Sequence, residues 1–238
     1  MTRPQKPNFL FIQTDQMTAF ALSHYGNPVV KTPNLDKLAA RGVVFQNAYC
    51  NNPICASSRF SMMSGQLSSR VGAYDNAAEF PAQVPTFAHY LVDQGYHTCL
   101  SGKMHFVGPD QLHGFQERVT TDIYPSDFGW TPDWLAEGHQ LPPSGMSMRS
   151  VVEAGISERS LQIDYDEEAC HQAEVKLWDY ARNSPDQPFF LAVSFTHPHN
   201  PFTTQSKYWN LYDHDKINMP TVTGKPVEER DPWSQRYY

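Results

Sequence analysis

Cys55 and Arg59 are the residues whose types and spacing suggest chemistry most directly. The segment that begins at Pro53 is predicted to be extended and to turn, at Cys55, into a short helix that runs to about Leu67. A cysteine at a helix start lies beside unpaired backbone N–H groups and the positive end of the helix dipole, so its sulfur is expected to face an anion pocket. Arg59 lies one turn later on the same side of the helix and can bind an oxyanion through two N–H groups. The spacing therefore predicts a nucleophile beside an anion clamp.

The rest of the chain shows the alternation of strands and helices that is typical of an α/β fold. Buried strands are predicted from apolar runs, and helices from caps, apolar spacing and glycine stops. A proline- and glycine-rich stretch over 108–156 is predicted to be a long loop region. The predicted strands are 8–15, 42–49, 96–101 and 188–196, and the predicted helices are 33–41, 55–67, 85–94 and 164–183. The first strand is expected to be central and covered on both faces.

Three further candidates follow the predicted strands. Asp15, His105 and His199 each come at or just after a strand end. Ligands of open α/β sheets bind beyond the carboxyl ends of the strands, so we expect these three side chains to face one crevice. Asp15 is a hard oxygen ligand suited to calcium or magnesium, although capping of the next turn explains it equally well.

Composition and charge exclude several classes of protein. The chain has 238 residues, of which 40% are hydrophobic and 18% charged, which predicts one compact globular unit. A formal charge of -7 gives no basic surface for nucleic acid or anionic lipid. No apolar run is long enough to span a membrane and no leader is evident at the start, so we expect a cytoplasmic protein. The four cysteines show no paired spacing, which predicts reduced thiols, with Cys50, Cys99 and Cys170 as buried apolar groups.

The segment around Cys55 resembles the Cys-x-Pro/Ala-x-Arg signature of the type I, formylglycine-dependent sulfatases, with Ser57 at the Pro/Ala position. Other stretches are similar to the choline sulfatase branch of that family, namely 66–70, 74–79, 101–105, 107–115 and 127–133. The resemblance implies an alkaline-phosphatase-like three-layer α/β/α sandwich with a mixed central sheet. It also implies that residues 1–238 are the N-terminal part of the catalytic domain, without the C-terminal metal-site segment and the small C-terminal domain.

The resemblance further implies a sulfuric ester hydrolase, with choline-O-sulfate as the favoured substrate. A formylglycine-forming maturation enzyme would oxidise Cys55 to an aldehyde, whose hydrate attacks sulfur. Lys103 and His105 would hold the hydrate and the sulfate, and Asn76 would line the sulfate pocket. His199 would share with His105 the role of proton donor.

A divalent cation is also implied by the resemblance, with Ca2+ favoured over Mg2+ or Mn2+. Asp15 and Cys55 would bind it, with Gln16 as an optional neutral ligand where the family has a second acid. Trp130 matches the tryptophan of the choline pocket, and an indole face attracts a quaternary ammonium group by roughly 0.5–2 kcal/mol. In its full-length form such an enzyme is compatible with a homo-oligomer.

Two other functions stay open. A phosphate mono- or diester hydrolase of the same fold would use the same anion pocket, although Trp130 and the choline-branch stretches argue against it. A non-catalytic fragment or anion-binding module is the other alternative, because activity is expected to be weak or lost in a truncated chain. Of the two neighbouring histidines, His197 is expected to be structural and His199 functional.

Overall fold

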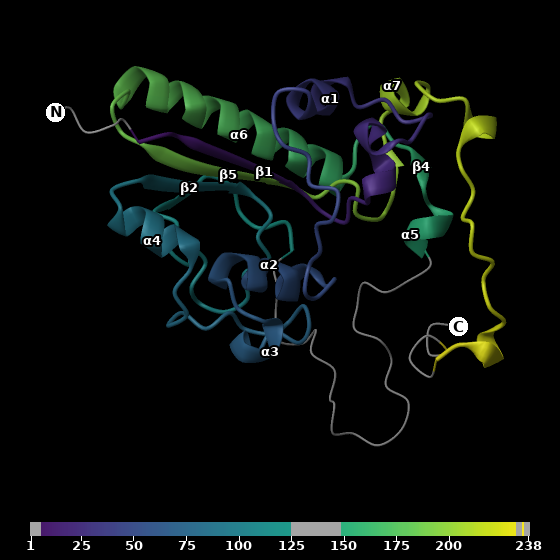
Figure 1. The fold of residues 1–238 in the computed structure, drawn as a ribbon, viewed down its shortest axis with the longest axis horizontal. Helices are drawn as coiled ribbons and strands as arrows, with labels where there is room; N and C mark the ends of the chain where they lie inside the picture. Colours follow the sequence, from purple (N-terminus) through teal and green to yellow (C-terminus); the bar gives the residue numbers. More distant parts are fainter. Residues whose placement is uncertain (1–5, 125–148, 232–234, 236–238) are drawn as a thin grey trace. The chain divides into compact units, whose positions relative to one another are not determined.

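The computed structural model describes residues 6–124, 149–231 and 235 (Figure 1). The chain divides into two compact units, whereas its length and composition predicted one. The first unit consists of Met1–Asp15, Cys50–Thr131 and Leu161–Pro198, and the second of Gln16–Tyr49, Pro132–Ser160 and His199–Tyr238. Among the residues that the structure describes, no helix is both long and apolar enough to cross a membrane.

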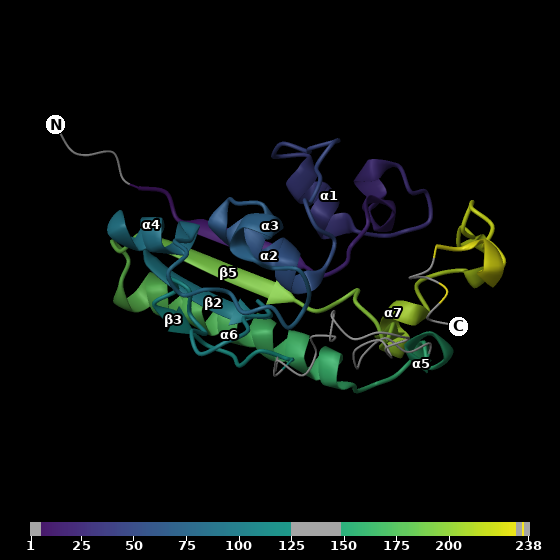
Figure 2. The ribbon, with the colours of Figure 1, turned by 90° about the horizontal axis from the view of Figure 1, so that it is seen from below.

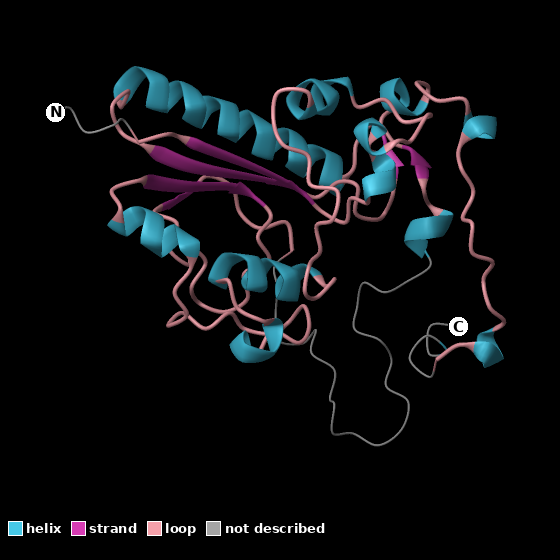
Figure 3. Ribbon diagram, viewed as in Figure 1, coloured by secondary structure: helices cyan, strands magenta, loops and turns pink. Residues whose placement is uncertain are grey.

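The first unit is built on a four-stranded sheet with the order β1-β5-β2-β3 (Figure 3). Its strands are β1 (Phe9–Thr14), β5 (Phe189–Phe195), β2 (His97–Gly102) and β3 (Glu117–Arg118). The described strands of this sheet pair only in parallel, so the mixed sheet that the resemblance implied is not seen in this part of the chain. The parallel register places Thr14 beside Phe195, and Gly102 beside Ser194, at one edge of the sheet. Asp15 and Lys103 directly follow the strands at this edge.

Helices cover both faces of this sheet, which gives the predicted three layers (Figure 2). On one face, Leu100, Phe190 and Ala192 pack with α2 (Cys55–Ser64) and α4 (Phe87–Asp93). On the other face, Cys99, Leu191 and Val193 pack against α6 (Leu161–Asn183). The alternation follows from the two-residue repeat of a strand, which sends successive side chains to opposite faces. The short helix α3 (Ser68–Val71) follows α2 in the same unit.

The first strand differs from its prediction. Within the described sheet β1 is an edge strand that pairs only with β5, and Leu10 and Ile12 are 50% and 58% exposed. The expectation of a central strand covered on both faces is therefore wrong for this part of the chain. An apolar run indicates that a strand is suited to burial, but it does not indicate which other segment covers that strand.

The second unit contains mostly short elements. Its helices are α1 (Pro33–Ala39), α5 (Arg149–Val152) and α7 (Ser206–Trp209), and its strands β4 (Gly155–Ile156) and β6 (Thr203–Thr204) pair in parallel. Single turns of 3-10 helix occur at Ala19–Ala21, Ser23–Tyr25, His214–Lys216 and Val227–Glu229. The strand predicted over 42–49 does not form. Val43, Phe45 and Tyr49 are largely exposed there, so this apolar run has no buried face and no partner strand among the described residues.

Candidate active site

The helix start predicted at Cys55 is confirmed. Ile54 is extended, α2 begins at Cys55, and Gly65 ends the helix in the left-handed conformation. The carboxamide oxygen of Asn76 accepts a hydrogen bond of 3.0 Å from the backbone N–H of Ala56, one of the N–H groups that the helix leaves unpaired. Asn76 therefore fixes the start of the helix next to the cysteine.

Lys103 reaches the site from the end of β2. Its backbone N–H donates to the carbonyl oxygen of Ser194 at 2.9 Å, so the ends of β2 and β5 run very close together there. The residue before it, Gly102, has a φ of +102°, and a Cβ at this position would lie 2.0 Å from the Ser194 carbonyl oxygen. Only glycine fits this close approach, which sets the direction in which Lys103 leaves the strand.

Asp15 forms the centre of a buried charge cluster. Its carboxylate forms an ion pair with the ammonium of Lys103, and its Oδ2 lies 3.2 Å from Nη2 of Arg59. All three side chains are buried. One carboxylate against two cations leaves an excess of positive charge beside the start of α2, which favours an anion.

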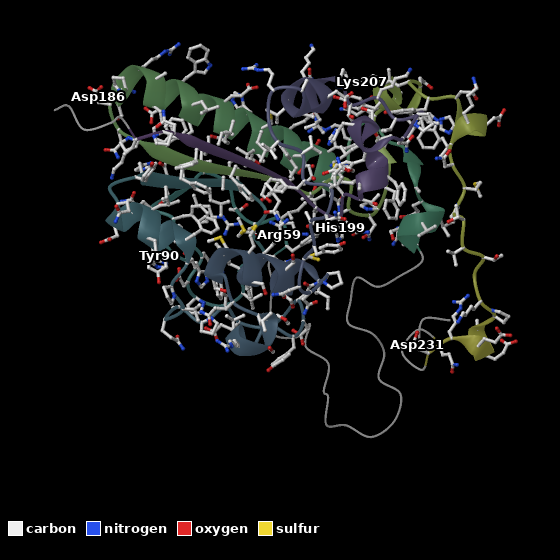
Figure 4. The ribbon with its side chains drawn as sticks, in the orientation of Figure 1. Arg59, Tyr90, Asp186, His199, Lys207 and Asp231 are labelled. Carbon is white, nitrogen blue, oxygen red and sulfur yellow. The ribbon has the colours of Figure 1, made fainter. Side chains whose placement is uncertain are left out.

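Arg59 points from α2 toward the sheet (Figure 4) and is only 2% exposed. Its Nη1 donates to the carbonyl oxygen of Lys103 at 2.7 Å and to the hydroxyl of Ser194 at 2.9 Å. Both terminal nitrogens therefore contact protein groups. The structure places Arg59 where it holds Asp15 and Lys103 together, and its direct contact with a bound oxyanion stays a prediction.

The Cys55 sulfur lies at the edge of this cluster. Its Sγ is 3.6 Å from Nζ of Lys103 and 3.9 Å from Oδ1 of Asp15. Burial raises the pKa of the Cys55 thiol, but the hydrogen bond of His105 and the charge of Lys103 outweigh burial, so the pKa lies below its ordinary value. Cys55, Asp15 and His105 therefore lie together in the first unit, whereas the predicted convergence of Asp15 and His105 with His199 stays a prediction.

His105 completes this group with an unusual backbone. Its φ is +60°, which is uncommon for a residue other than glycine. Its Nε2 lies 3.0 Å from the carbonyl oxygen of Asn76. A carbonyl oxygen can only accept, so Nε2 carries the hydrogen and Nδ1 is the nitrogen that can take up a proton.

Tyr124 is a site residue that no sequence signal indicated. Its ring lies 4.6 Å from Nζ of Lys103, and its ring centre is 6.0 Å from that of His105. Burial raises the pKa of the Tyr124 hydroxyl, although the charge of Lys103 opposes the shift. The residue therefore faces the site as a neutral phenol.

The end of β5 is held by a partly buried acid, Asp166, from α6. Asp166 accepts hydrogen bonds from the backbone N–H groups of Thr196 at 2.6 Å and His197 at 2.9 Å, and lies 2.7 Å from Nδ1 of His197. This arrangement agrees with the structural role expected of His197.

For three predicted residues the structure gives no position relative to this site. His199 belongs to the second unit, where its Nδ1 is 2.8 Å from the carbonyl oxygen of Asn200, and Gln16 also belongs to that unit. Trp130 lies outside the described residues. The roles of these three side chains stay predictions. Among the other cysteines, all free, Cys99 is buried as predicted, whereas Cys50 and Cys170 are exposed.

The described side chains offer too few oxygen ligands for a divalent cation. Calcium needs about six to eight oxygen ligands, and Asp15 offers one carboxylate that two cations already neutralise. Within residues 6–124 and 149–231, no cluster of three or more His, Cys, Asp or Glu side chains is arranged for a metal ion. Asp15 and Cys55 therefore do not form a cation site by themselves.

Comparison with known proteins identifies the family. The model of the sulfatase family matches residues 7–231. The chain belongs to the sulfatase family. It is 47% identical over 234 residues to a choline-sulfatase from Rhizobium meliloti, a match that covers 97% of this chain and 46% of that enzyme. It is 30% identical to an arylsulfatase from Clostridium perfringens, with 91% of this chain and 48% of that enzyme covered.

The fold of this sulfatase chain is shared with solved structures. A phosphonate monoester hydrolase from Silicibacter pomeroyi superimposes with a TM-score of 0.68 at 20% identity, over 94% of this chain and 48% of that one. The likeness extends to further sulfatase structures and shows the predicted alkaline-phosphatase-like α/β fold. The chain spans about half the length of the curated relatives it matches.

Proposed function

We propose that this sulfatase chain contributes the nucleophile and the anion pocket of an enzyme that hydrolyses sulfate esters, with choline-O-sulfate as the first candidate substrate. The observation that carries the proposal is the position of Cys55, at a helix start and 3.6 Å from the buried ammonium of Lys103. The identity to a choline-sulfatase supports the choice of substrate. Trp130 remains the candidate for binding the quaternary ammonium group.

The proposed nucleophile is formylglycine, made from Cys55 by a formylglycine-forming enzyme. At this position one hydroxyl of a hydrated aldehyde would attack sulfur while the S–O bond to the alcohol breaks, and the alcohol would leave with a proton from a histidine or lysine. Loss of a proton from the second hydroxyl would then release sulfate and restore the aldehyde. Lys103 lies where it would stabilise negative charge on the oxygen atoms that react. His105 would move the proton through Nδ1, because Nε2 is held by Asn76. Arg59 would keep Asp15 and Lys103 in register, and His199 is the second candidate proton donor.

A calcium, magnesium or manganese ion is retained as a proposal for the longer protein only. Asp15 is the ligand that this chain would supply, with Cys55 and Gln16 as further candidates. No step of the mechanism proposed here depends on the ion. We also propose a cytoplasmic location. A small-molecule substrate, rather than a nucleic acid or a membrane, is supported by the net charge of -7.

Intact mass and hydrolysis together test the proposal. Conversion of Cys55 to formylglycine lowers the mass by about 18 Da, and the Cys55→Ala variant should lose both the mass change and turnover. The matched control is Cys99→Ala, which removes a buried thiol that faces α6. A mass change without turnover of any sulfate ester would contradict the assignment of this chain as a catalytic unit.

A phosphate ester hydrolase is the second candidate, favoured by the structural likeness to a phosphonate monoester hydrolase. The positive pocket around Lys103 does not distinguish sulfate from phosphate by charge sign alone. Parallel assays with choline sulfate, p-nitrophenyl sulfate and p-nitrophenyl phosphate separate the two. Turnover confined to the phosphate ester would reject the sulfatase proposal.

A further inference from the structure

The segment after β3 runs beside the end of β2 and extends past it. Leu100 pairs with Arg118 in the parallel register, and the N–H of Val119 donates to the carbonyl oxygen of Leu100 at 2.9 Å. Beyond this point β2 ends, and the backbone of Gly102 to His105 turns toward Cys55. The backbone N–H groups of this turn need new partners, because an unpaired buried donor costs about 1–3 kcal/mol.

Alternate side chains of the neighbouring segment supply these partners. The hydroxyl of Thr120 accepts from the N–H of Gly102 at 2.7 Å. Oδ2 of Asp122 accepts from the N–H of Met104 at 3.0 Å and from that of His105 at 2.8 Å. Thr120 and Asp122, two residues apart in the segment after β3, both turn their side chains to this backbone.

Asp122 is itself held by charge. Nη2 of Arg118 lies 2.7 Å from the same Oδ2, and both side chains are buried, with 9% and 7% of their surface exposed. Burial raises the pKa of Asp122, but the charge of Arg118 and the hydrogen bonds from Met104 and His105 outweigh it, so the pKa lies below its usual range. The acid is therefore a fixed acceptor, held in place under the turn.

We propose that Arg118, Thr120 and Asp122 form a positioning clamp that sets Lys103 and His105 against Cys55. The clamp fixes the left-handed backbone of His105, whose φ of +60° is costly without such support. Its hydrogen bonds go to the backbone of residues 102, 104 and 105, so these are positioning residues. The inference deepens the proposed function and rests on it for the meaning of the site, but its geometry can be tested without turnover.

The test compares Asp122→Asn and Thr120→Val in the whole chain. Asp110→Asn is the matched control, because Asp110 also accepts from two consecutive backbone N–H groups, those of Leu112 at 2.9 Å and His113 at 3.0 Å. The first readout is NMR of the His105 imidazole and of the contact between the Lys103 side chain and the Tyr124 ring. The second is the division of any loss between kcat and KM for p-nitrophenyl sulfate, with formylglycine occupancy measured by mass.

Asp122→Asn should shift the His105 resonances, weaken the contact between Lys103 and Tyr124, and lower kcat by about 10- to 100-fold with KM within about two-fold. Asp110→Asn should leave the His105 resonances, the contact between Lys103 and Tyr124, and kcat unchanged. A variant that is less stable but keeps wild-type His105 and Lys103 signals would overturn the proposal, because its role would then be structural only. If Asp122→Asn does not fold, Thr120→Val decides by the same criteria. If the wild-type chain hydrolyses nothing, the proposed function fails, and the NMR comparison still decides whether the clamp exists.

Discussion

The ammonium of Lys103 is completely buried between the Asp15 carboxylate and the Cys55 thiol. Loss of Lys103 is therefore expected to affect both the free energy of unfolding and the turnover. Replacing it with methionine, Lys103→Met, should lower the free energy of unfolding by about 3 kcal/mol, the lower end for a broken buried pair, since Arg59 still accompanies Asp15. Turnover of the matured enzyme should fall at least about a hundredfold. Urea unfolding and a steady-state assay measure the two effects.

A double-mutant cycle with Asp15→Asn isolates the pair. The double variant should be more stable than the sum of the single losses predicts, because neither charge is then left unpaired. Lys176→Met is the control, since that ammonium pairs with the partly exposed Glu117 and Asp179 and should cost no more than about 1 kcal/mol. Strict additivity of Asp15→Asn and Lys103→Met would show that the two side chains do not interact.

His113 makes stability depend on pH. It is fully buried, with its ring 4.3 Å from Phe80 and 4.5 Å from Phe106. Burial lowers the pKa of His113 below 6.5, against the opposing charge of Asp110 and with a smaller contribution from His89. The folded state therefore favours the neutral ring, and this contribution should be complete above about pH 6.5 and decrease as the pH falls below it.

The variant His113→Asn tests this dependence, because asparagine tolerates the φ of +42° at this position and does not titrate. It should be less stable at pH 7.5, yet its unfolding free energy should change less between pH 7 and about pH 5 than that of the wild type. Equal slopes for the two proteins in urea unfolding series would show that His113 is not the responsible group.

Part of the site could be predicted from local signals in the sequence, because Cys55 and Arg59 share one helix face and His105 follows an apolar run. Lys103 was indicated only by the resemblance to the sulfatase family. Tyr124 and Asp122 could not be predicted, because their roles arise only when the segment after β3 returns along β2. A side chain that acts through the backbone of a distant residue leaves no spacing to detect.

At the scale of elements, the contact between β2 and β5 depends on one missing side chain. Gly102→Ala would place a methyl group 2.0 Å from the Ser194 carbonyl oxygen and should cost about 3 kcal/mol or more. Gly95→Ala is the control, because Gly95 also has a positive φ but nothing lies within 4 Å of its Cβ position, so it should cost only about 1–2 kcal/mol. Thermal unfolding of both variants measures the difference, and equal losses would refute the close-packing argument.

The helices that were predicted well have start and stop signals in their own sequence. Helix α2 has an extended residue before it and a glycine after it, and α4 begins behind Thr86, whose side chain caps the helix together with His89. The predictions for 8–15 and 42–49 were wrong in burial and in type, respectively. Burial and strand formation both depend on which other segment lies beside an apolar run. The composition of the run does not identify that segment.

At the scale of the whole molecule, the chain covers about half of its relatives, and its described residues offer one carboxylate for a cation. Titration of Ca2+ into residues 1–238 should therefore give a dissociation constant weaker than about 1 mM, beyond the range of built calcium sites. Calorimetry measures this directly, with Asp15→Asn as the comparison. Binding in the micromolar range that disappears in Asp15→Asn would show a cation site that the described side chains do not reveal.

The first turn of α2 also imposes an order of events on the life of the protein. Ala56 and Ser57 are inaccessible and Arg59 nearly so once the helix is packed, although these are the residues a modifying enzyme would have to read around Cys55. The oxidation proposed for Cys55 would then have to precede compaction, during or soon after synthesis. The fraction of molecules that carry the modified residue would then depend on the rate of thiol oxidation relative to the rate of folding. Slower folding would raise that fraction.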